Sequence, residues 1–193
     1  MNILFATSNI NKVSEIKAAL PEHISLFSLK DIDTNISEID EPYETLEENA
    51  VHKAVSYSNL LKMNCFSEDT GLEVFSLNGA PGVKSARYAG FPSDTDKNMA
   101  LLLKNLEGAA DRSAQFRTVI ALIINDQIHC FEGICKGQII QQPKGKNGFG
   151  YDPIFIPDGS DKSFAEMNTG EKNKFSHRKK AVDKMIEYLK STT

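Results

Sequence analysis

Two adjacent carboxylates, Glu68 and Asp69, are the residues of this sequence that best suit chemistry. They stand in Cys65–Leu72 (CFSEDTGL), whose apolar start predicts the end of a buried strand. Gly71 predicts a turn or the close approach of a ligand. Two acids at a strand end are costly to fold unless a cation neutralises them, and Mg²⁺ prefers carboxylate oxygens. A solvated turn is the alternative, because Asp, Thr and Gly are ordinary turn residues; this stretch alone favours the turn.

A strand, a polar turn and a helix at the start of the chain predict an anion site. Met1–Thr7 is an apolar run typical of a buried strand, and Val13–Leu20 has the apolar spacing of a helix. Ser8, Asn9 and Lys12 lie at the turn, where helix N–H groups and the helix dipole favour phosphate. The alternative is a simple Asn or Ser cap. The sequence has neither a Walker A motif nor a G-x-G-x-x-G motif.

An acidic run and a second lysine follow. Asp31–Glu44 contains Glu38 and Glu41, and most such runs are solvated loops. Thr45–Glu48 (TLEE) is a capping box, which predicts a helix that carries Lys53. A lysine in a helix usually faces solvent, but one beside acids and phosphates is a candidate ligand.

Two further stretches have unusual composition. Gly145–Pro153 (GKNGFGYDP) combines three glycines with two aromatic rings, which permits close backbone approach and stacking on a base. A plain surface loop is the alternative. Ser176 is the predicted N-cap of the last helix, with His177 and Arg178 in its first turn. A cation there opposes the helix dipole, so these donors favour a ligand.

The remaining pattern alternates strands and helices. It predicts strands at 24–29, 72–77 and 154–156, a turn at 78–79, helices at 46–62, 96–106 and 177–190, and a hairpin of 114–124 with 128–136.

Composition describes an ordinary soluble globular protein of one domain or two tight lobes. Of its 193 residues 40% are hydrophobic and 25% charged, and the net charge of −4 argues against broad nucleic-acid binding. No signal peptide or membrane-spanning run is predicted. Cys65, Cys130 and Cys135 all stand in apolar runs, which predicts buried, reduced thiols in a cytosolic protein.

Six stretches together resemble the inosine/xanthosine triphosphate pyrophosphatase family, whose members remove non-standard purine nucleotides. They run nearly from end to end in the family's order: Thr7–Lys12, Thr45–Ala54, Ser67–Leu72, Gly79–Arg87, Gly148–Pro153 and Ser176–Arg178. The departures are small. Glu68 stands where Asp is common, and Ser37 stands where Pro is common.

The resemblance implies an α/β fold that is elongated and two-lobed, with a central mixed β-sheet flanked by helices and the active site in the cleft between the lobes. It also implies one such domain over residues 1–193 and a cytoplasmic homodimer, with no nucleic-acid or membrane partner. The implied reaction converts a nucleoside triphosphate (XTP, ITP or dITP) and water to the monophosphate and pyrophosphate, with Mg²⁺.

The resemblance also implies roles for individual residues. Asp69 would be the general base, and Mg²⁺ would be bound by Asp69, Glu68 and one of Glu38 and Glu41. Phe149 would cover the base, while Asp152, His177 and Arg178 would contact its edge. The implied substrate-binding residues are Thr7, Ser8, Asn9, Lys12, Lys53, Thr70, Phe149, Gly150, Tyr151, Asp152, Lys172, His177 and Arg178.

Two alternatives come from other classes of protein. A related pyrophosphatase for modified pyrimidines would share the fold and the metal, but it would lack the Ser176–Arg178 motif. A non-catalytic nucleotide-binding module is the second alternative, and the acid pair and Lys12 count against it.

Overall fold

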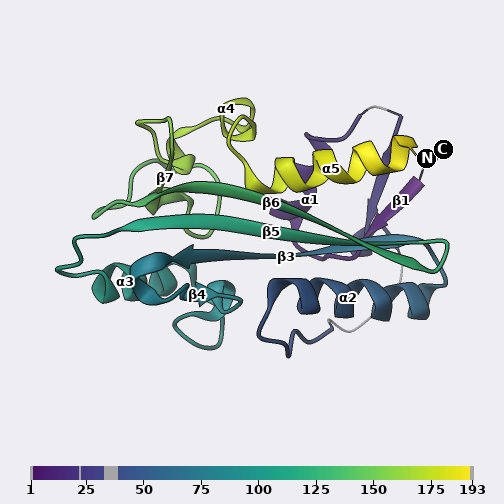
Figure 1. Ribbon diagram of the computed structural model, residues 1–193, viewed down its shortest axis with the longest axis horizontal. Coiled ribbons are helices and arrows are strands. Elements are labelled where there is room, and N and C mark those ends of the chain that lie inside the picture. The colour runs from purple at the N-terminus through teal and green to yellow at the C-terminus, as the bar shows by residue number, and fades with distance from the viewer. Residues whose placement is uncertain (1, 22, 33–38, 192–193) are drawn as a thin grey trace. The chain divides into compact units, whose positions relative to one another are not determined.

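The computed structural model describes residues 2–21, 23–32 and 39–191. Figure 1 labels its main helices and strands. The strands are β1 (Asn2–Phe5), β2 (Ser25–Ser28), β3 (Cys65–Val74), β4 (Pro81–Gly82), β5 (Ser113–Ile124), β6 (Gln127–Ile139) and β7 (Phe155–Pro157). The α-helices are α1 (Ile10–Lys17), α2 (Leu46–Leu61), α3 (Thr95–Asn105), α4 (Thr169–Asn173) and α5 (His177–Ser191), and short 3₁₀ turns occur at Leu29–Asp31, Phe75–Leu77, Ser85–Arg87, Asp152–Ile154 and Phe164–Glu166.

The strands form a mixed seven-stranded sheet. Its order is β2-β1-β3-β5-β6-β7, and β4 pairs with β3. β1 is parallel to β2 and β3, whereas the β3–β4 and β6–β7 pairs are antiparallel. The mixed sheet with flanking helices confirms the predicted α/β class.

The chain divides into two compact units, the first built from three separate segments and the second from two. The first unit contains Met1–Asp69, Thr118–Gly133 and Arg178–Thr193. The second unit contains Thr70–Arg117 and Ile134–His177. The boundary between units therefore falls within β3, directly after Asp69.

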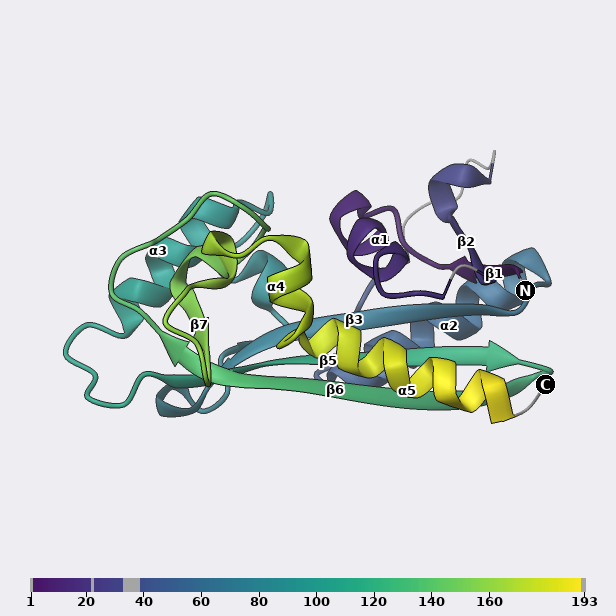
Figure 2. The ribbon, with the colours of Figure 1, turned by 90° about the horizontal axis from the view of Figure 1, so that it is seen from above.

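Alternation along the strands gives the first unit a core on each face of its sheet. Ile3, Phe5 and Phe66 share one cluster with α1 and α5, and the rings of Phe5 and Phe66 stack with centroids 4.6 Å apart. Leu4 and Cys65, on the opposite face, share a cluster with Tyr57 of α2. In Figures 1 and 2, α5 runs along one side of the first unit's strands, and α2 lies on the other side.

The second unit has its own apolar core. Aromatic rings dominate it: Phe116, Phe155 and Phe164 pack with centroid separations of 4.7–6.0 Å. Leu102 and Leu106, at the end of α3, complete the same cluster and are fully buried. All of these residues belong to the second unit.

Turn chemistry explains two connections that the sequence predicts. Asn78 and Gly79 have positive φ values of 53° and 84°, and β4 then pairs back onto β3. Asn125 and Asp126, with φ values of 50° and 61°, join β5 to its neighbour β6. Asn, Asp and Gly tolerate these left-handed conformations better than other residues.

The structure differs from the prediction at β3, α1 and α4. β3 runs unbroken from Cys65 to Val74, so the predicted strand end before a turn at Gly71 is wrong. α1 begins three residues earlier than predicted. α4 lies in a segment for which the sequence analysis predicted no helix, although Asn168 and Glu171 form a capping box that marks its start. None of the described helices combines the length and hydrophobicity that a membrane span requires.

The three cysteines differ in exposure, which makes them a chemical probe of the fold. Cys65 and Cys135 are buried as predicted, but Cys130 is exposed, so the prediction of three buried thiols is wrong for Cys130. Cys130 lies in the stretch of β6 where most side chains are exposed or half-buried. Burial raises the pKa of the Cys65 thiol to about 12 and so suppresses its reactive thiolate.

We therefore expect a thiol-alkylating reagent to modify Cys130 alone in the folded protein and all three cysteines in denaturant. Peptide mass spectrometry after alkylation at pH 8 checks this. Modification of Cys65 at the rate of Cys130 would contradict the described fold of the first unit.

Candidate functional site

The two adjacent carboxylates lie within β3 and are both buried. Glu68 is 2% exposed and Asp69 is 5% exposed, which excludes the solvated turn. Side chains alternate between the two faces of a strand. Phe66 faces the α1 and α5 side, whereas Ser67 donates a hydrogen bond to the Ala50 carbonyl of α2. Glu68 therefore belongs to the α1 and α5 face, and Asp69 belongs to the α2 face.

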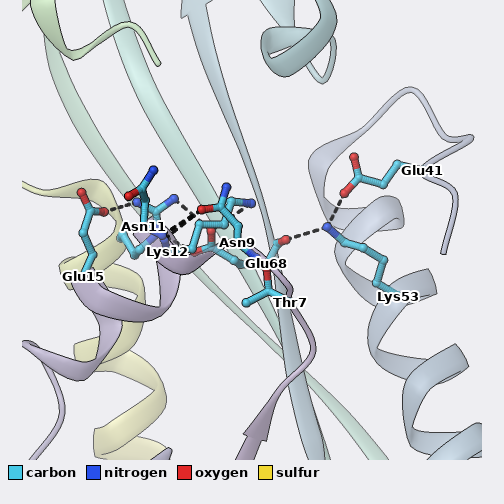
Figure 3. A network of polar contacts seen from close by, with 9 residues as sticks. Thr7, Asn9, Asn11, Lys12, Glu15, Glu41, Lys53 and Glu68 are labelled. Carbon is cyan, nitrogen blue, oxygen red and sulfur yellow. Dashed lines mark hydrogen bonds and ion pairs between the residues drawn. The ribbon is translucent and has the colours of Figure 1, made fainter. Parts of the chain in front are cut away.

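Glu68 is held by cations on its own face. Arg178 donates from Nε to Glu68 Oε2 at 2.8 Å and from Nη2 to Glu68 Oε1 at 2.9 Å. Lys12 Nζ lies 3.2 Å from Glu68 Oε1, and Arg178 Nη1 also pairs with Glu15 of α1. Figure 3 shows Lys12 and Glu15 on one side of Glu68. We call Lys12, Glu15, Glu68 and Arg178 the ion-pair cluster.

Electrostatics keep Glu68 and Arg178 charged. Burial raises the pKa of the Glu68 carboxyl, but the positive charges of Arg178 and Lys12 outweigh burial and hold that pKa well below its usual range. Burial lowers the pKa of Arg178, and the Glu68 and Glu15 carboxylates more than restore it. The cluster is therefore two cations and two anions, which is the condition under which buried charges are tolerated.

Two members of the cluster have roles predicted from the sequence, and both roles stay predictions. Arg178, predicted at the edge of a base, is 2% exposed, and its guanidinium contacts carboxylates of the first unit. Glu68, predicted to bind metal, accepts hydrogen bonds from Arg178 at both of its oxygens. Glu68 also faces away from Asp69, so these neighbours are poorly placed to share one ion.

The opposite face carries a second lysine and a second carboxylate. Lys53 of α2 is 8% exposed, donates to the backbone carbonyl of Glu68 at 2.8 Å and pairs with the Glu41 carboxylate. Figure 3 shows Lys53 between Glu41 and the strand. Lys53 thus brings Glu41 to the part of β3 where Asp69 faces α2. Glu38, the other predicted acid of this segment, lies outside the described residues.

The carboxylates suit a magnesium ion whose coordination is completed by other groups. Within residues 2–21, 23–32 and 39–191, no three His, Cys, Asp or Glu side chains gather in a metal-binding group. Mg²⁺ commonly keeps several waters and binds through one or two carboxylates together with substrate phosphates. Glu41, which pairs with Lys53, and Asp69, which follows the Glu68 carbonyl that Lys53 contacts, match this donor chemistry, whereas Glu68 contacts cations.

The loop before α1 is organised by its own side chains. Asn9 is the N-cap, and its Oδ1 accepts from the N–H groups of Asn11 at 3.0 Å and Lys12 at 3.3 Å. Thr7 Oγ1 accepts from the Asn9 N–H at 3.2 Å, and Ser8 is exposed beside it. The simple Asn cap considered as an alternative is therefore present. Because the Asn9 side chain already accepts from these N–H groups, the Lys12 ammonium would attract a phosphate more strongly than they would.

A separate polar group lies in the second unit. Asp152 Oδ2 accepts from the Phe149 N–H at 2.9 Å and from Lys172 Nζ at 2.7 Å. Lys172 is 7% exposed, and its ammonium lies 5.3 Å from the centre of the Phe149 ring. Gly148 has a φ of +74°, and a Cβ there would lie 2.0 Å from Asp152 Oδ2. The glycine is thus required for the loop to close on Asp152.

The other residues predicted around a base have structural contacts as well. The His177 ring is 3% exposed and stacks on Phe116 with centroids 4.7 Å apart. Tyr151 is buried, and its hydroxyl donates to the Ser85 carbonyl at 2.8 Å. Gly150 has a φ of +61°. Thr70 follows Asp69 in β3 and is half-buried.

Glu15 is the site residue that the sequence analysis missed. It lies three residues after Lys12 in α1, a spacing that puts both side chains on one helix face. That spacing was the available signal, but an acid and a lysine at such a distance are common on exposed helices. Only the long-range contact with Arg178 distinguishes this pair.

The comparisons with known proteins match this chain over all or nearly all of its length. The family model of the Ham1 family matches residues 3–188. The dITP/XTP pyrophosphatase of Christiangramia forsetii is 50% identical over 98% of this chain and 99% of its own length, and that of Flavobacterium johnsoniae is 48% identical over 100% of both. The solved structure of the Staphylococcus aureus Ham1 protein is 34% identical, covers 100% of both chains and superposes with a TM-score of 0.89. The chain belongs to the Ham1 family.

Proposed function

We propose that this protein hydrolyses non-standard purine nucleoside triphosphates (XTP, ITP and dITP) to the monophosphate and pyrophosphate, with Mg²⁺. The observation that carries the proposal is the buried Asp69 on β3, with Lys53 and Glu41 on its own face and Lys12 at Glu68 on the other. Full-length relatives named dITP/XTP pyrophosphatase support the substrate class.

Lys12 and Lys53 of the first unit are the proposed phosphate-binding residues. A triphosphate is a concentrated negative charge, and ammonium groups neutralise it in both the ground and transition states. The Lys12 side chain is 19% exposed and the Lys53 side chain 11%, so each charge is only partly screened by water. Substrate binding would require Lys53 to exchange its contact with Glu41 for one with phosphate, which would release Glu41 for other ligands.

Asp69 is the proposed general base. A water that attacks phosphorus must lose a proton, and a carboxylate in a buried site accepts it. A bound Mg²⁺ would supply charge neutralisation and hold the phosphate oxygens in position. In this chain Asp69 and Glu41 would hold the ion. Asp69 would also orient the water and take its proton.

Phe149 and Lys172 of the second unit are the proposed base-recognition residues. Phe149 offers an aromatic face for stacking, and Lys172 offers an ammonium that only donates hydrogen bonds. Hypoxanthine and xanthine present a 6-keto acceptor to such a donor, whereas adenine presents an amino group. Asp152 fixes both residues through the contacts described above.

A substrate panel tests the proposal against the pyrimidine alternative. We expect kcat/KM for XTP, ITP and dITP to exceed that for ATP, GTP, CTP and dUTP when pyrophosphate release is measured. A preference for pyrimidine triphosphates would contradict the proposed substrate class. Binding without pyrophosphate release from any nucleotide would contradict the enzymatic function itself.

We expect activity to require Mg²⁺, because Asp69 and Glu41 leave most of the coordination shell to water and phosphate. Chelation should abolish turnover, and added Mg²⁺ should restore it. Ca²⁺ should substitute poorly, since its larger and looser shell holds phosphate in a different geometry. Undiminished turnover in chelator would show that the lysines alone neutralise the substrate.

A further inference from the structure

Asn49 is a fully buried amide that the proposed chemistry does not use. It lies near the start of α2 and is 0% exposed. Its Oδ1 accepts from the Tyr43 N–H at 2.9 Å, and its Nδ2 donates to the Tyr43 carbonyl at 3.0 Å. One side chain therefore binds both polar backbone groups of a single residue in the segment before the helix.

That segment carries Glu41, which lies two residues before Tyr43. Residues 39–45 belong to no helix or strand, so regular backbone hydrogen bonds do not set the position of Glu41. Two side chains of α2 contact the segment instead. Asn49 binds the backbone at Tyr43, and Lys53 pairs with the Glu41 carboxylate. Their spacing of four residues places Asn49 and Lys53 on one face of α2.

The two contacts differ in what happens to them when substrate binds. Lys53 is a proposed phosphate ligand, and it would exchange Glu41 for phosphate. Asn49 is neutral and fully buried, and its hydrogen bonds are made to backbone groups, so an anion that attracts Lys53 does not attract it away. Asn49 would therefore keep its contact and, with it, the backbone position from which the Glu41 carboxylate extends.

We propose that Asn49 is a positioning residue for the metal, which holds the backbone beside Glu41 so that this carboxylate reaches Mg²⁺ once Lys53 has moved to phosphate. The proposal rests on the proposed function and names a determinant of metal binding within it. Groups that orient metal ligands contribute about ten- to a hundredfold to metal affinity. A purely structural asparagine would lower stability when it is replaced and would leave metal affinity unchanged.

Asn49→Leu is the informative variant, because leucine keeps a similar shape and removes both hydrogen bonds. We expect the Mg²⁺ concentration for half-maximal turnover of ITP to rise about tenfold, while kcat at saturating Mg²⁺ falls by less than about threefold. A second readout needs no turnover. With Mn²⁺ alone as the probe, loss of the free-ion signal in electron paramagnetic resonance should give a Kd about tenfold above wild type. Asn49→Ala is measured in the same way and replaces Asn49→Leu if that variant does not fold.

A double-mutant cycle with Glu41→Gln shows whether the effect of Asn49 passes through Glu41. When residue 41 can no longer supply a charged ligand, the position of its backbone matters less to the metal. Asn49→Leu should therefore add less than about threefold to the Mg²⁺ and Mn²⁺ constants in the Glu41→Gln background.

Asn98→Leu is the matched control. Asn98 of α3 is 4% exposed, accepts from the Ala89 N–H at 2.7 Å and donates to the Ala86 carbonyl at 3.0 Å. It thus binds a loop through the same two amide groups, but it belongs to the second unit, whereas Glu41 and Asp69 belong to the first. Its loss should lower the melting temperature and leave both metal constants at their wild-type values.

Two results would overturn the inference. One is a wild-type constant for either ion in folded Asn49→Leu or Asn49→Ala, which would limit Asn49 to a structural role. The other is a full tenfold effect of Asn49→Leu in the Glu41→Gln background, which would make Asn49 independent of Glu41. Neither result touches the proposed function, which would fail only if the wild-type protein released no pyrophosphate from ITP.

Discussion

Asp69→Asn is expected to lower kcat by about a hundredfold or more while leaving the protein folded, because a positioned general base contributes on that order. Asparagine matches the size of aspartate but cannot accept the proton of the attacking water, and it removes a negative charge that a metal requires. Substrate binding should change much less than kcat, since Lys12 and Lys53 remain. Steady-state kinetics with ITP at saturating Mg²⁺ measure both quantities.

Glu73→Gln provides the control for this substitution. Glu73 is the next carboxylate along β3 and binds Gln115 and Arg117 of the second unit at 2.7 and 2.9 Å. Its amide variant removes a carboxylate from the same strand without touching the proposed chemistry, so kcat should stay near wild type. An Asp69→Asn enzyme with more than about a tenth of wild-type kcat would assign the proton transfer to another group.

Lys172→Met is expected to lower the ITP-to-ATP ratio of kcat/KM by about two orders of magnitude or more. Methionine keeps an unbranched chain but removes the ammonium that would donate to a 6-keto oxygen. ITP should lose most of its advantage, while ATP, which presents an amino group there, should change little. A ratio of two substrates on one preparation does not depend on the folded fraction, which matters because the variant leaves buried Asp152 without its lysine.

Lys162→Met is the matched control for Lys172→Met. Lys162 belongs to the same unit, but its side chain is 50% exposed and pairs with Glu171 on the surface. Such exposed ion pairs contribute little to stability, so Lys162→Met should leave the ITP-to-ATP ratio of kcat/KM unchanged. An unaltered ratio in Lys172→Met itself would mean that the base edge is recognised by other groups of the second unit, with His177 the next to substitute.

Local patterns predicted most elements because their causes are local. The capping box at Thr45–Glu48 and the turn residues Asn125 and Asp126 each determine the backbone within a few residues. The full length of β3 was not predicted, because it depends on a contact with a residue distant in the sequence. Gly71 resembles a turn residue, but in the structure it is a strand residue at which a Cβ would lie 2.6 Å from the Gly82 carbonyl oxygen. The glycine serves the close approach of β4, and this contact is invisible in the sequence around it.

The candidate site could be predicted as a set of residues but not as a set of contacts. Adjacent carboxylates at 68 and 69 predict one metal site if both stand at the end of a strand. Once β3 is continuous, alternation separates them onto opposite faces. The partner of Glu68 is Arg178, 110 residues away, and no periodicity connects the two. The role predicted for Arg178 therefore rests on motif chemistry alone, and it stays a prediction.

The most direct test of the central claim identifies the products of ITP hydrolysis by the wild-type protein with Mg²⁺. Ion-exchange chromatography separates IMP, IDP, pyrophosphate and orthophosphate in one run. The proposed attack and the two-lysine phosphate site predict IMP and pyrophosphate in equal amounts, with no IDP at any time. Formation of IDP with orthophosphate would contradict the account, because the protein would then cleave the terminal phosphate.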